Sequence, residues 1–252
     1  MPAGYVALSG PGVEGAALAT LEAPLSEALA DGTFYAFAAH HAEARPFTGR
    51  GIAYAVPLST GTRVVVRRSR HGGLLGGIRD DKFFGATRAP YELELSITLR
   101  RLGVATPEMV AYATYPAGAM FRRADVVTRE VPKSRDLAAA LGALSRSDSK
   151  HSLIAATGKL LASLSIAGAR HPDLNIKNIL IADNGFGGIE AYALDVDRVW
   201  LDAPGKQSIL EANLRRLSRS AVKWRRMQGL PIEEADLLAI ESRALELIEL
   251  AR

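Results

Sequence analysis

Four runs of apolar and β-branched residues predict β-strands in the first half of the chain. They are Ile52 to Pro57, Arg63 to Arg67, Glu108 to Thr114 and Ala119 to Thr128. The polar residues Ser59 to Thr62 separate the first two runs, a spacing typical of a hairpin. Before them, residues 1 to 50 mix small apolar residues with Gly and Pro, and the pattern there indicates only a short helix at Pro24 to Ala30.

Five segments with apolar residues at helical spacing predict helices. They are Pro90 to Leu102, Ser134 to Leu144, Ser149 to Ala167, Lys206 to Met227 and Ile232 to Leu250. In the third and clearest of them, Ser149 is the expected N-cap of a helix with one apolar face. Two short strands, Asn178 to Ala182 and Glu190 to Asp195, are expected on either side of a turn at Asn184 to Gly188.

The order of these elements predicts an α+β fold. A small sheet-rich lobe at residues 1–130 is expected to precede a larger, mainly helical lobe at residues 131–252, the two forming a single bilobal domain. The segment HPDLNIKNIL at residues 171–180 falls in the loop between the clearest helix and the late pair of strands. This loop is the place where chemistry is expected.

The composition of the 252 residues bounds the class of protein. With 48% hydrophobic residues the chain can bury a sizeable core. The absence of cysteine excludes disulfides, thiolate catalysis and cysteine-ligated metals, and the default expectation is a cytoplasmic protein. The N-terminus lacks the positive region of a secretory signal, and no apolar run approaches the roughly 18 residues that span a bilayer.

Charge is unevenly distributed along the chain. Five acidic and no basic residues precede Arg45, so the net charge of +4 leaves about +9 on the remainder. A basic remainder suits an anionic partner, although a solvated basic surface is the more common explanation. The helix expected at Lys206 to Met227 carries a basic face formed by Arg215, Arg219, Lys223 and Arg226, which could face water, anionic lipid or an acidic substrate.

Asp173, Asn178 and Asp195 form the constellation that carries the chemistry. Protein-kinase-like enzymes use a loop aspartate, an asparagine five residues later and a second aspartate after a short hairpin, in this order. Asp173 would orient the acceptor hydroxyl and take its proton, while Asn178 and Asp195 would bind Mg²⁺ at the nucleotide phosphates. The alternative is structural: a helix cap, a turn residue and a surface carboxylate.

The upstream nucleotide-binding groups are less standard. The lysine expected at the end of a strand is replaced by Arg67, which can bind phosphate bidentately, and its partner on the next helix would be Glu92 or Glu94. The turns Gly49-Arg50-Gly51 and His71-Gly72-Gly73 offer backbone amides beside basic groups, as phosphate-binding turns do. Ordinary hairpins and solvated charges would explain the same residues.

Several motifs in one order resemble the lipopolysaccharide kinase family, most closely its Kdo (3-deoxy-D-manno-octulosonic acid) kinases. The resemblance spans Gly49 to about Lys223. Its motifs are GRG at 49–51, VVRRSRHGGLLG at 65–76, TRAPYELEL at 87–95, HPDLNIKNIL at 171–180, LDVDR at 194–198 and NLRRLSRSAVK at 213–223. Val196 departs from the family pattern, which has an aromatic residue after the metal-binding aspartate.

The resemblance implies a protein kinase-like fold and a set of roles. Asp173 resembles the catalytic aspartate, Asn178 and Asp195 the metal ligands, Arg67 the phosphate-binding strand residue and Glu92 its helix partner. ATP and Mg²⁺ are the implied cofactors, and the γ-phosphate would pass to the 4-hydroxyl of Kdo on a lipid A precursor. This places the protein in the cytoplasm, peripherally at the inner face of the inner membrane, with no nucleic-acid partner.

Two residues of the loop allow further expectations. Pro172 replaces the arginine that grips a phosphorylated activation loop, so we expect constitutive activity. Lys177 could reach the transferring phosphate as a catalytic group, although a surface lysine explains it nearly as well. Two other functions stay open: a small atypical protein kinase, and a nucleotide-binding pseudokinase that acts as a scaffold.

Overall fold

The computed structural model describes residues 1–10, 12–30, 32–49, 51–69, 81–144, 150–185 and 187–251. The chain divides into two compact units. Unit 1 comprises Met1–Ile97 and Glu108–Glu130, and unit 2 comprises Thr98–Pro107 and Val131–Arg252. Sheet dominates the first unit and helices dominate the second, so the α+β class predicted from the sequence is confirmed.

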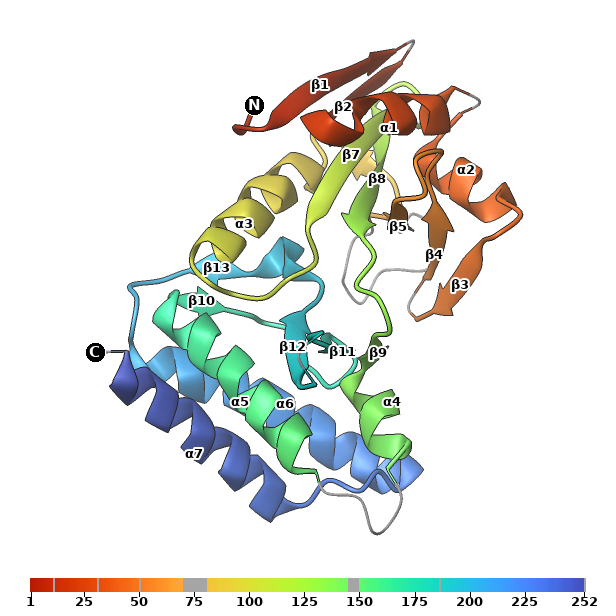
Figure 1. Cartoon of the computed structure of the whole chain (residues 1–252). Helices are drawn as coiled ribbons and strands as arrows, with labels where there is room; N and C mark the ends of the chain where they lie inside the picture. Colours follow the sequence, from red (N-terminus) through yellow and green to blue (C-terminus); the bar gives the residue numbers. More distant parts are fainter. Residues whose placement is uncertain are drawn as a thin grey trace. The chain divides into compact units, whose positions relative to one another are not determined.

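Unit 1 is built on one antiparallel sheet (Figure 1). Its strands are β1 (Tyr5–Gly10), β2 (Val13–Leu18), β3 (Arg45–Thr48), β4 (Ile52–Pro57), β5 (Arg63–Arg68), β6 (Phe83–Phe84), β7 (Met109–Pro116) and β8 (Phe121–Arg129). Their spatial order is β1-β2-β7-β8-β5-β4-β3, with β6 paired to β8. The predicted hairpin is confirmed, because β4 and β5 pair with Pro57 opposite Arg63.

Helices cover both faces of this sheet. Two helices, α1 (Glu22–Leu29) and α2 (Phe34–His40), pack on one face, preceded by the short 3-10 helix η1 (Ala19–Leu21), while α3 (Ala89–Arg101) packs on the other. Side chains alternate along the strands, so Val127 joins the core beneath α1 and α2 and Val126 joins the core beneath α3. The predicted helix at Pro90 to Leu102 is therefore confirmed as α3.

The N-terminal strands were not predicted from the sequence. β2 pairs with β7, about a hundred residues away in the chain, and small residues line the contact: Gly15 lies opposite Ala113. A Cβ atom at Gly15 would lie 2.1 Å from the Tyr112 carbonyl oxygen, so only glycine allows this close approach. A strand of small residues buries little apolar area and leaves a weak pattern in the sequence.

Unit 2 packs helices around a central one. Its helices are α4 (Leu137–Gly142), α5 (His151–Ile166), α6 (Gln207–Gln228) and α7 (Glu234–Leu250), with the short 3-10 helix η2 (Val196–Arg198). A small sheet in the order β12-β11-β9 comprises Ile189–Ala193, Ile179–Asp183 and Arg135–Asp136, and β10 (Ala169–Arg170) pairs with β13 (Trp200–Leu201).

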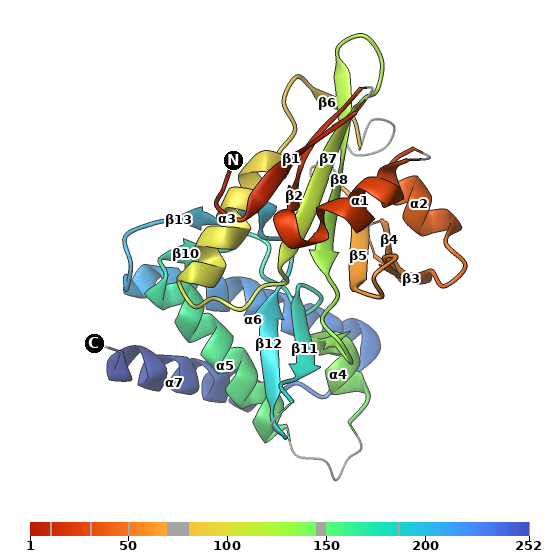
Figure 2. The ribbon, with the colours of Figure 1, turned by 45° about the horizontal axis from the view of Figure 1, so that its top comes forward.

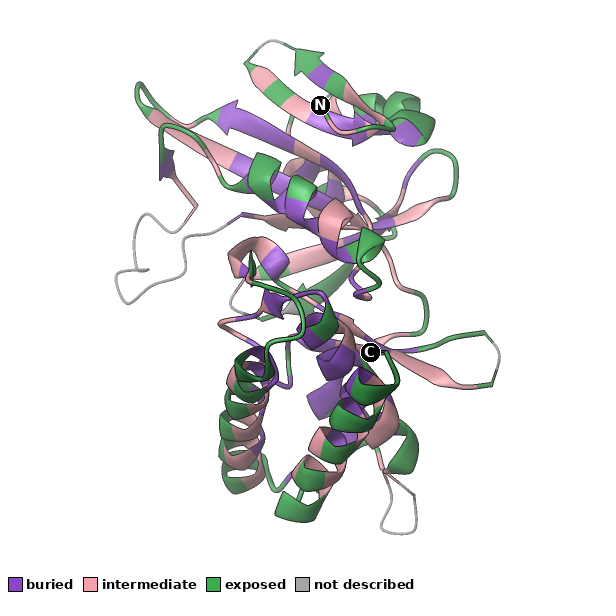
Figure 3. Cartoon of the chain, turned by 90° about the vertical axis from the view of Figure 1, so that its left-hand side faces the viewer, coloured by how far each residue is buried: buried purple, intermediate pink, exposed green. Residues whose placement is uncertain are grey.

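In this unit α5 contacts α6, α7 and β12. β11 and β12 lie side by side next to α4 (Figure 2), and buried residues gather on the inward-facing sides of the helices (Figure 3). No helix within the described ranges is both long and apolar enough to span a bilayer.

Two helix starts differ from the sequence prediction. The helix predicted from Ser134 begins at Leu137, because Asp136 caps it by accepting the Ala139 amide at 2.8 Å. The predicted cap Ser149 lies outside the described residues, and the N-cap of α5 is Lys150, whose side chain makes no capping hydrogen bond.

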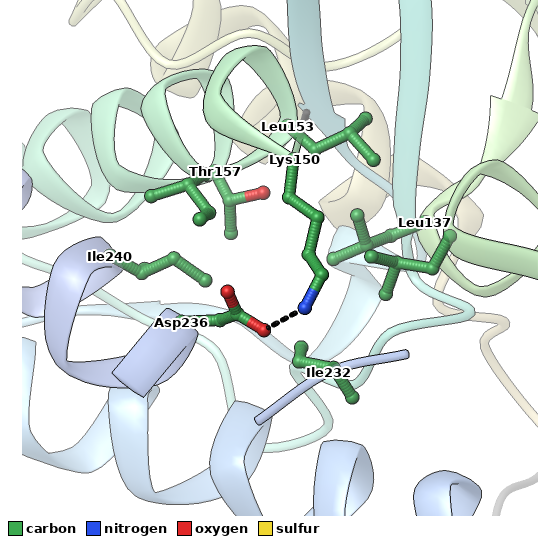
Figure 4. Close-up of a pocket in the computed structure, with 9 residues that line it drawn as sticks. Leu137, Lys150, Leu153, Thr157, Ile232, Asp236 and Ile240 are labelled. Atoms are coloured by element: carbon green, nitrogen blue, oxygen red, sulfur yellow. Dashed lines mark hydrogen bonds and ion pairs between the residues drawn. The ribbon is translucent and has the colours of Figure 1, made fainter. Parts of the chain in front are cut away.

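The Lys150 amine instead lies 2.6 Å from Asp236 of α7, beside a cavity of about 10 Å³ walled by apolar side chains (Figure 4). This volume holds about one water molecule, which excludes a nucleotide or a sugar.

The buried carboxylate of Asp125, on β8, holds the first turn of α2. Its Oδ2 accepts the Tyr35 amide at 2.9 Å, and the hydroxyl of Tyr115 accepts the Phe34 amide at 3.0 Å. Amides in the first helical turn have no partner within the helix, so these side chains supply the missing acceptors. Burial raises the pKa of Asp125 to about 6, although the Tyr35 amide and Arg68 act in the opposite direction.

This raised pKa predicts how stability depends on pH. The folded-state pKa of about 6 exceeds the reference value of 3.8, so protonated Asp125 is favoured by folding. Its contribution to the free energy of unfolding is therefore complete below about pH 4 and is lost as the pH rises through about 6. Asp125→Asn keeps a carbonyl acceptor for the Tyr35 amide but cannot titrate. Urea unfolding at several pH values should show that this variant loses less stability between about pH 4 and 7, by at most about 3 kcal/mol. Parallel profiles for the two proteins would contradict the assignment.

Candidate active site

His171, the first residue of the loop at residues 171–178, is buried. Its amide donates to Asn213 Oδ1 at 2.9 Å, its Nε2 bonds the Leu194 carbonyl oxygen at 2.8 Å, and its Nδ1 accepts the Asp173 amide at 3.3 Å. These partners assign the proton to Nε2, which makes the ring neutral. Burial lowers the pKa of His171 and favours the same neutral form.

Asn175 organises the loop through its side chain. Its Nδ2 donates to the carbonyl oxygen of Asp173 at 3.0 Å and to the carboxylate Oδ1 of Asp173 at 3.3 Å. Its Oδ1 accepts the amides of Lys177 at 2.9 Å and Asn178 at 3.2 Å. One amide side chain therefore fixes both the backbone course of the loop and the direction of the Asp173 carboxylate.

Asn178 closes the loop onto Asp173 and onto the following hairpin. Its Nδ2 donates to the Asp173 carbonyl oxygen at 2.9 Å, and its own carbonyl oxygen accepts the Leu194 amide at 2.9 Å. The side chain is buried. Because Nδ2 is engaged in this way, Oδ1 is the atom that Asn178 can offer to a cation.

The backbone of Leu194, the residue before Asp195, forms hydrogen bonds through both its amide and its carbonyl oxygen. The amide of Leu194 donates to Asn178 and its carbonyl oxygen bonds His171, so the position of the next residue is fixed. Asp195 is exposed and has a left-handed backbone (φ 53°, ψ 48°), which is uncommon outside glycine but tolerated by aspartate. Such conformations cost energy and cluster at functional sites.

The charges of Asp173 and Asp195 both act on the imidazole of His171. Burial lowers the pKa of His171, whereas the charges of Asp195, Asp173 and Asp197 oppose this effect. Both carboxylates therefore lie close enough to His171 to act on it electrostatically. Asp173, Asn178 and Asp195 thus lie at one end of the β11–β12 hairpin, and their roles as base and metal ligands stay predictions.

The donor set fits magnesium bound together with phosphates. Within the described part of the chain, no group of three or more His, Cys, Asp or Glu side chains could hold a metal ion. Mg²⁺ needs fewer protein ligands, because it keeps waters and takes oxygens from substrate phosphates. The amide oxygen of Asn178 and the carboxylate of Asp195 supply the hard oxygen donors that this cation prefers.

In unit 1, Arg67 of β5 forms an ion pair and a hydrogen bond with Glu92 of α3. The side chain of Glu92 is 4% exposed and that of Arg67 is 27% exposed. A buried carboxylate requires such a partner, and Glu94, the other candidate, is exposed. The pairing of a strand cation with a helix acid is therefore present, whereas phosphate binding by Arg67 stays a prediction.

The predicted glycine turns are only partly described. Gly49 and Gly51 lie in the turn between β3 and β4, where the Gly49 amide donates to the Gly51 carbonyl oxygen at 3.1 Å. This amide is already engaged within the turn. Arg50 and the His71-Gly72-Gly73 turn lie outside the described residues, so their proposed contact with phosphate stays a prediction.

Lys177, expected to reach the transferring phosphate, forms an ion pair with Asp136. Its amine lies 2.7 Å from Asp136 Oδ2 and 5.4 Å from the centre of the Trp224 ring. The predicted role in phosphate transfer therefore has no support from these contacts and stays a prediction.

Asn175, Asn213 and Ser220 support the loop but were not predicted from the sequence. Asn213 of α6 is buried and also donates to the Ala169 carbonyl oxygen at 2.9 Å, and the Ser220 hydroxyl accepts the Ile176 amide at 3.3 Å. The sequence did contain a sign of this role for Asn213: it lies between Leu210 and Leu217, on the apolar stripe of the helix predicted at Lys206 to Met227. A polar residue at such a position requires a buried partner.

The chain matches the lipopolysaccharide kinase (Kdo/WaaP) family over residues 44–242. A 3-deoxy-D-manno-octulosonic acid kinase from Vibrio parahaemolyticus is 30% identical over 207 residues, covering 81% of this chain and 82% of that protein. Proteins of the same name from Vibrio cholerae and Xylella fastidiosa are each 32% identical, over 70% of this chain and over 72% and 68% of their own lengths.

The solved structure of WaaP in complex with acyl carrier protein superimposes with a TM-score of 0.57. The match covers 91% of this chain and 90% of that chain at 17% identity, so it bears on the fold alone. The protein kinase-like fold implied by the sequence motifs is confirmed. The chain belongs to the lipopolysaccharide kinase (Kdo/WaaP) family, and it is a phosphotransferase that acts on a sugar hydroxyl.

Proposed function

We propose that this chain transfers the γ-phosphate of ATP, with Mg²⁺, to the 4-hydroxyl of Kdo on a lipid A precursor. The observation that carries the proposal is the loop in which Asn175 fixes Asp173 and Asn178 while His171 and Asn178 hold the residue before Asp195. The names of the relatives, which are Kdo kinases, support the choice of acceptor.

In this proposal Asp173 is the residue that acts on the acceptor hydroxyl. Its carboxylate would accept the hydroxyl proton and orient the oxygen for attack, and Asn175 keeps it aimed by donating to Oδ1. Asn178 and Asp195 would hold Mg²⁺, which supplies neutralisation of the charge on the phosphates. His171 and Asn175 position these groups and do not react.

Arg67 is the group assigned to the non-transferred phosphates of ATP. Guanidinium binds phosphate through a planar pair of donors, and Glu92 holds this planar group in one orientation. Arg67 therefore replaces the usual lysine without loss of charge. This supports an active kinase over a pseudokinase.

Because the acceptor is a glycolipid, the proposed site of action is the cytoplasmic face of the inner membrane, where the protein would associate peripherally. Exposed cations of unit 2 would be attracted to an anionic lipid surface. Neither contact with a protein substrate nor with nucleic acid is required by this proposal.

Transfer of labelled phosphate tests the function. Purified protein is incubated with γ-labelled ATP, Mg²⁺ and either the Kdo-bearing lipid A precursor or a generic protein acceptor. We expect label on the glycolipid alone, and a loss of about a thousandfold in Asp173→Ala, because a positioned base is removed. NMR of the product identifies the hydroxyl. Label on the protein acceptor alone would favour an atypical protein kinase, and nucleotide binding without transfer would favour a pseudokinase.

Asn175 provides a second test of the loop. Asn175→Asp keeps an acceptor for the Lys177 and Asn178 amides but replaces the donor that faces Asp173 with an oxygen. We expect kcat to fall by about a hundredfold, with a smaller change in the KM for ATP and a shift of the pH profile. Asn184→Asp is the matched control, since its Oδ1 accepts the Gly188 amide in a turn remote from Asp173. Equal kinetics for the two variants would exclude a positioning role.

A further inference from the structure

Five cations form what we call the α6 basic stripe. They are Arg215, Arg216, Arg219, Lys223 and Arg226. All five are exposed, and within the part of the chain that the structure describes none forms an ion pair. The adjacent Arg225 differs, because it pairs with Glu233 at 2.9 Å. The stripe is thus a run of uncompensated positive charge along one helix.

This charge pattern opposes the stability of the helix that carries it. Arg215 and Arg219 are four residues apart, as are Arg219 and Lys223, and like charges at this spacing repel each other. Glu211 is the sole acidic residue among the 22 of α6. A helix that only needed a solvated face would be served better by mixed charges, so the pattern indicates an anionic ligand.

The loop-facing edge of α6 contacts the catalytic loop at three places. Asn213 bonds His171, Ser220 bonds Ile176, and the ring of Trp224 lies 5.4 Å from the amine of Lys177. The spacings of seven and four residues put these contacts on one helical face.

Arg216 and Lys223 are the stripe residues next to that edge. They precede and follow Ser220 by four and three residues, so each lies one turn from it along the helix. The stripe therefore begins beside the loop that carries Asp173.

Lys177 extends the positive surface onto the loop itself. Its side chain is 43% exposed, and its amine has three donors, of which Asp136 uses one. The partly exposed Trp224, which follows the stripe residue Lys223 in α6, lies against this amine. An aromatic face beside several cations suits a ligand that combines a sugar ring with phosphate or carboxylate groups.

We infer that the α6 basic stripe, with Lys177 and Trp224, binds the anionic head group of the acceptor glycolipid. This inference rests on the proposed function, in which the acceptor carries the carboxylate of Kdo and the phosphates of lipid A. Guanidinium groups bind such oxyanions bidentately, and the continuity of the stripe with the loop brings the sugar to Asp173. The stripe is thus an acceptor-binding surface.

Binding in the absence of nucleotide tests the inference separately from catalysis. The full chain is mixed with phosphatidylcholine vesicles that contain either the Kdo-bearing lipid A precursor or phosphatidylglycerol of equal total charge, and bound protein is measured by sedimentation. The triple variant Arg216→Gln, Arg219→Gln, Lys223→Gln keeps helix-forming residues. We expect it to bind the glycolipid vesicles at least about tenfold more weakly, with a smaller change on phosphatidylglycerol. In the transfer assay its KM for the glycolipid should rise.

The control is Lys159→Gln, Arg243→Gln, Lys206→Gln, which removes three positive charges from unit 2 at positions that pair with acidic residues. It should bind as the unaltered chain does, and circular dichroism with single variants such as Lys223→Gln guards against a folding defect. Unchanged binding by the stripe variant would overturn the inference, as would an equal loss on phosphatidylglycerol, which indicates general membrane docking. Stripe-dependent glycolipid binding without phosphate transfer would uphold the inference and reject the proposed function.

Discussion

A neutral, buried imidazole holds the candidate active site together. His171 bonds the Leu194 carbonyl oxygen through Nε2 and accepts the Asp173 amide through Nδ1, so it joins the loop to the end of the following hairpin. Protonation would place a donor against the Asp173 amide and would bury a charge. Burial lowers the pKa of His171 and thereby protects the arrangement. The positions of Asp173 and Asp195 both follow from this one ring.

Helix α6 supports that ring from one side and presents charge on another. Asn213 accepts a hydrogen bond from the His171 amide within the core, whereas the α6 basic stripe faces solvent. In the inferred role, one helix both stabilises the loop at residues 171–178 and binds the acceptor beside it. Unit 1 contains a separate pair, Arg67 and Glu92. There too a buried side chain, Glu92, holds a more exposed cation, Arg67, in place.

Much of this site followed from sequence because its parts are local. Asp173 and Asn178 lie five residues apart in one loop, and a short hairpin separates them from Asp195, so their spacing is meaningful before folding. The partner of Arg67 was narrowed to Glu92 or Glu94, and burial in the folded protein decided between them.

By itself the sequence determined the hairpin at Ile52 to Arg67, the helix α3 and the loop at 171–178, since each depends on neighbouring residues. The order of several such local motifs also indicated the family. Tertiary structure alone decided that Lys177 pairs with Asp136, that Asn213 holds His171, and that the N-terminal strand β2 joins β7. These contacts join residues about forty to a hundred positions apart. Their partners are set by which surfaces bury each other, and no local pattern records that choice.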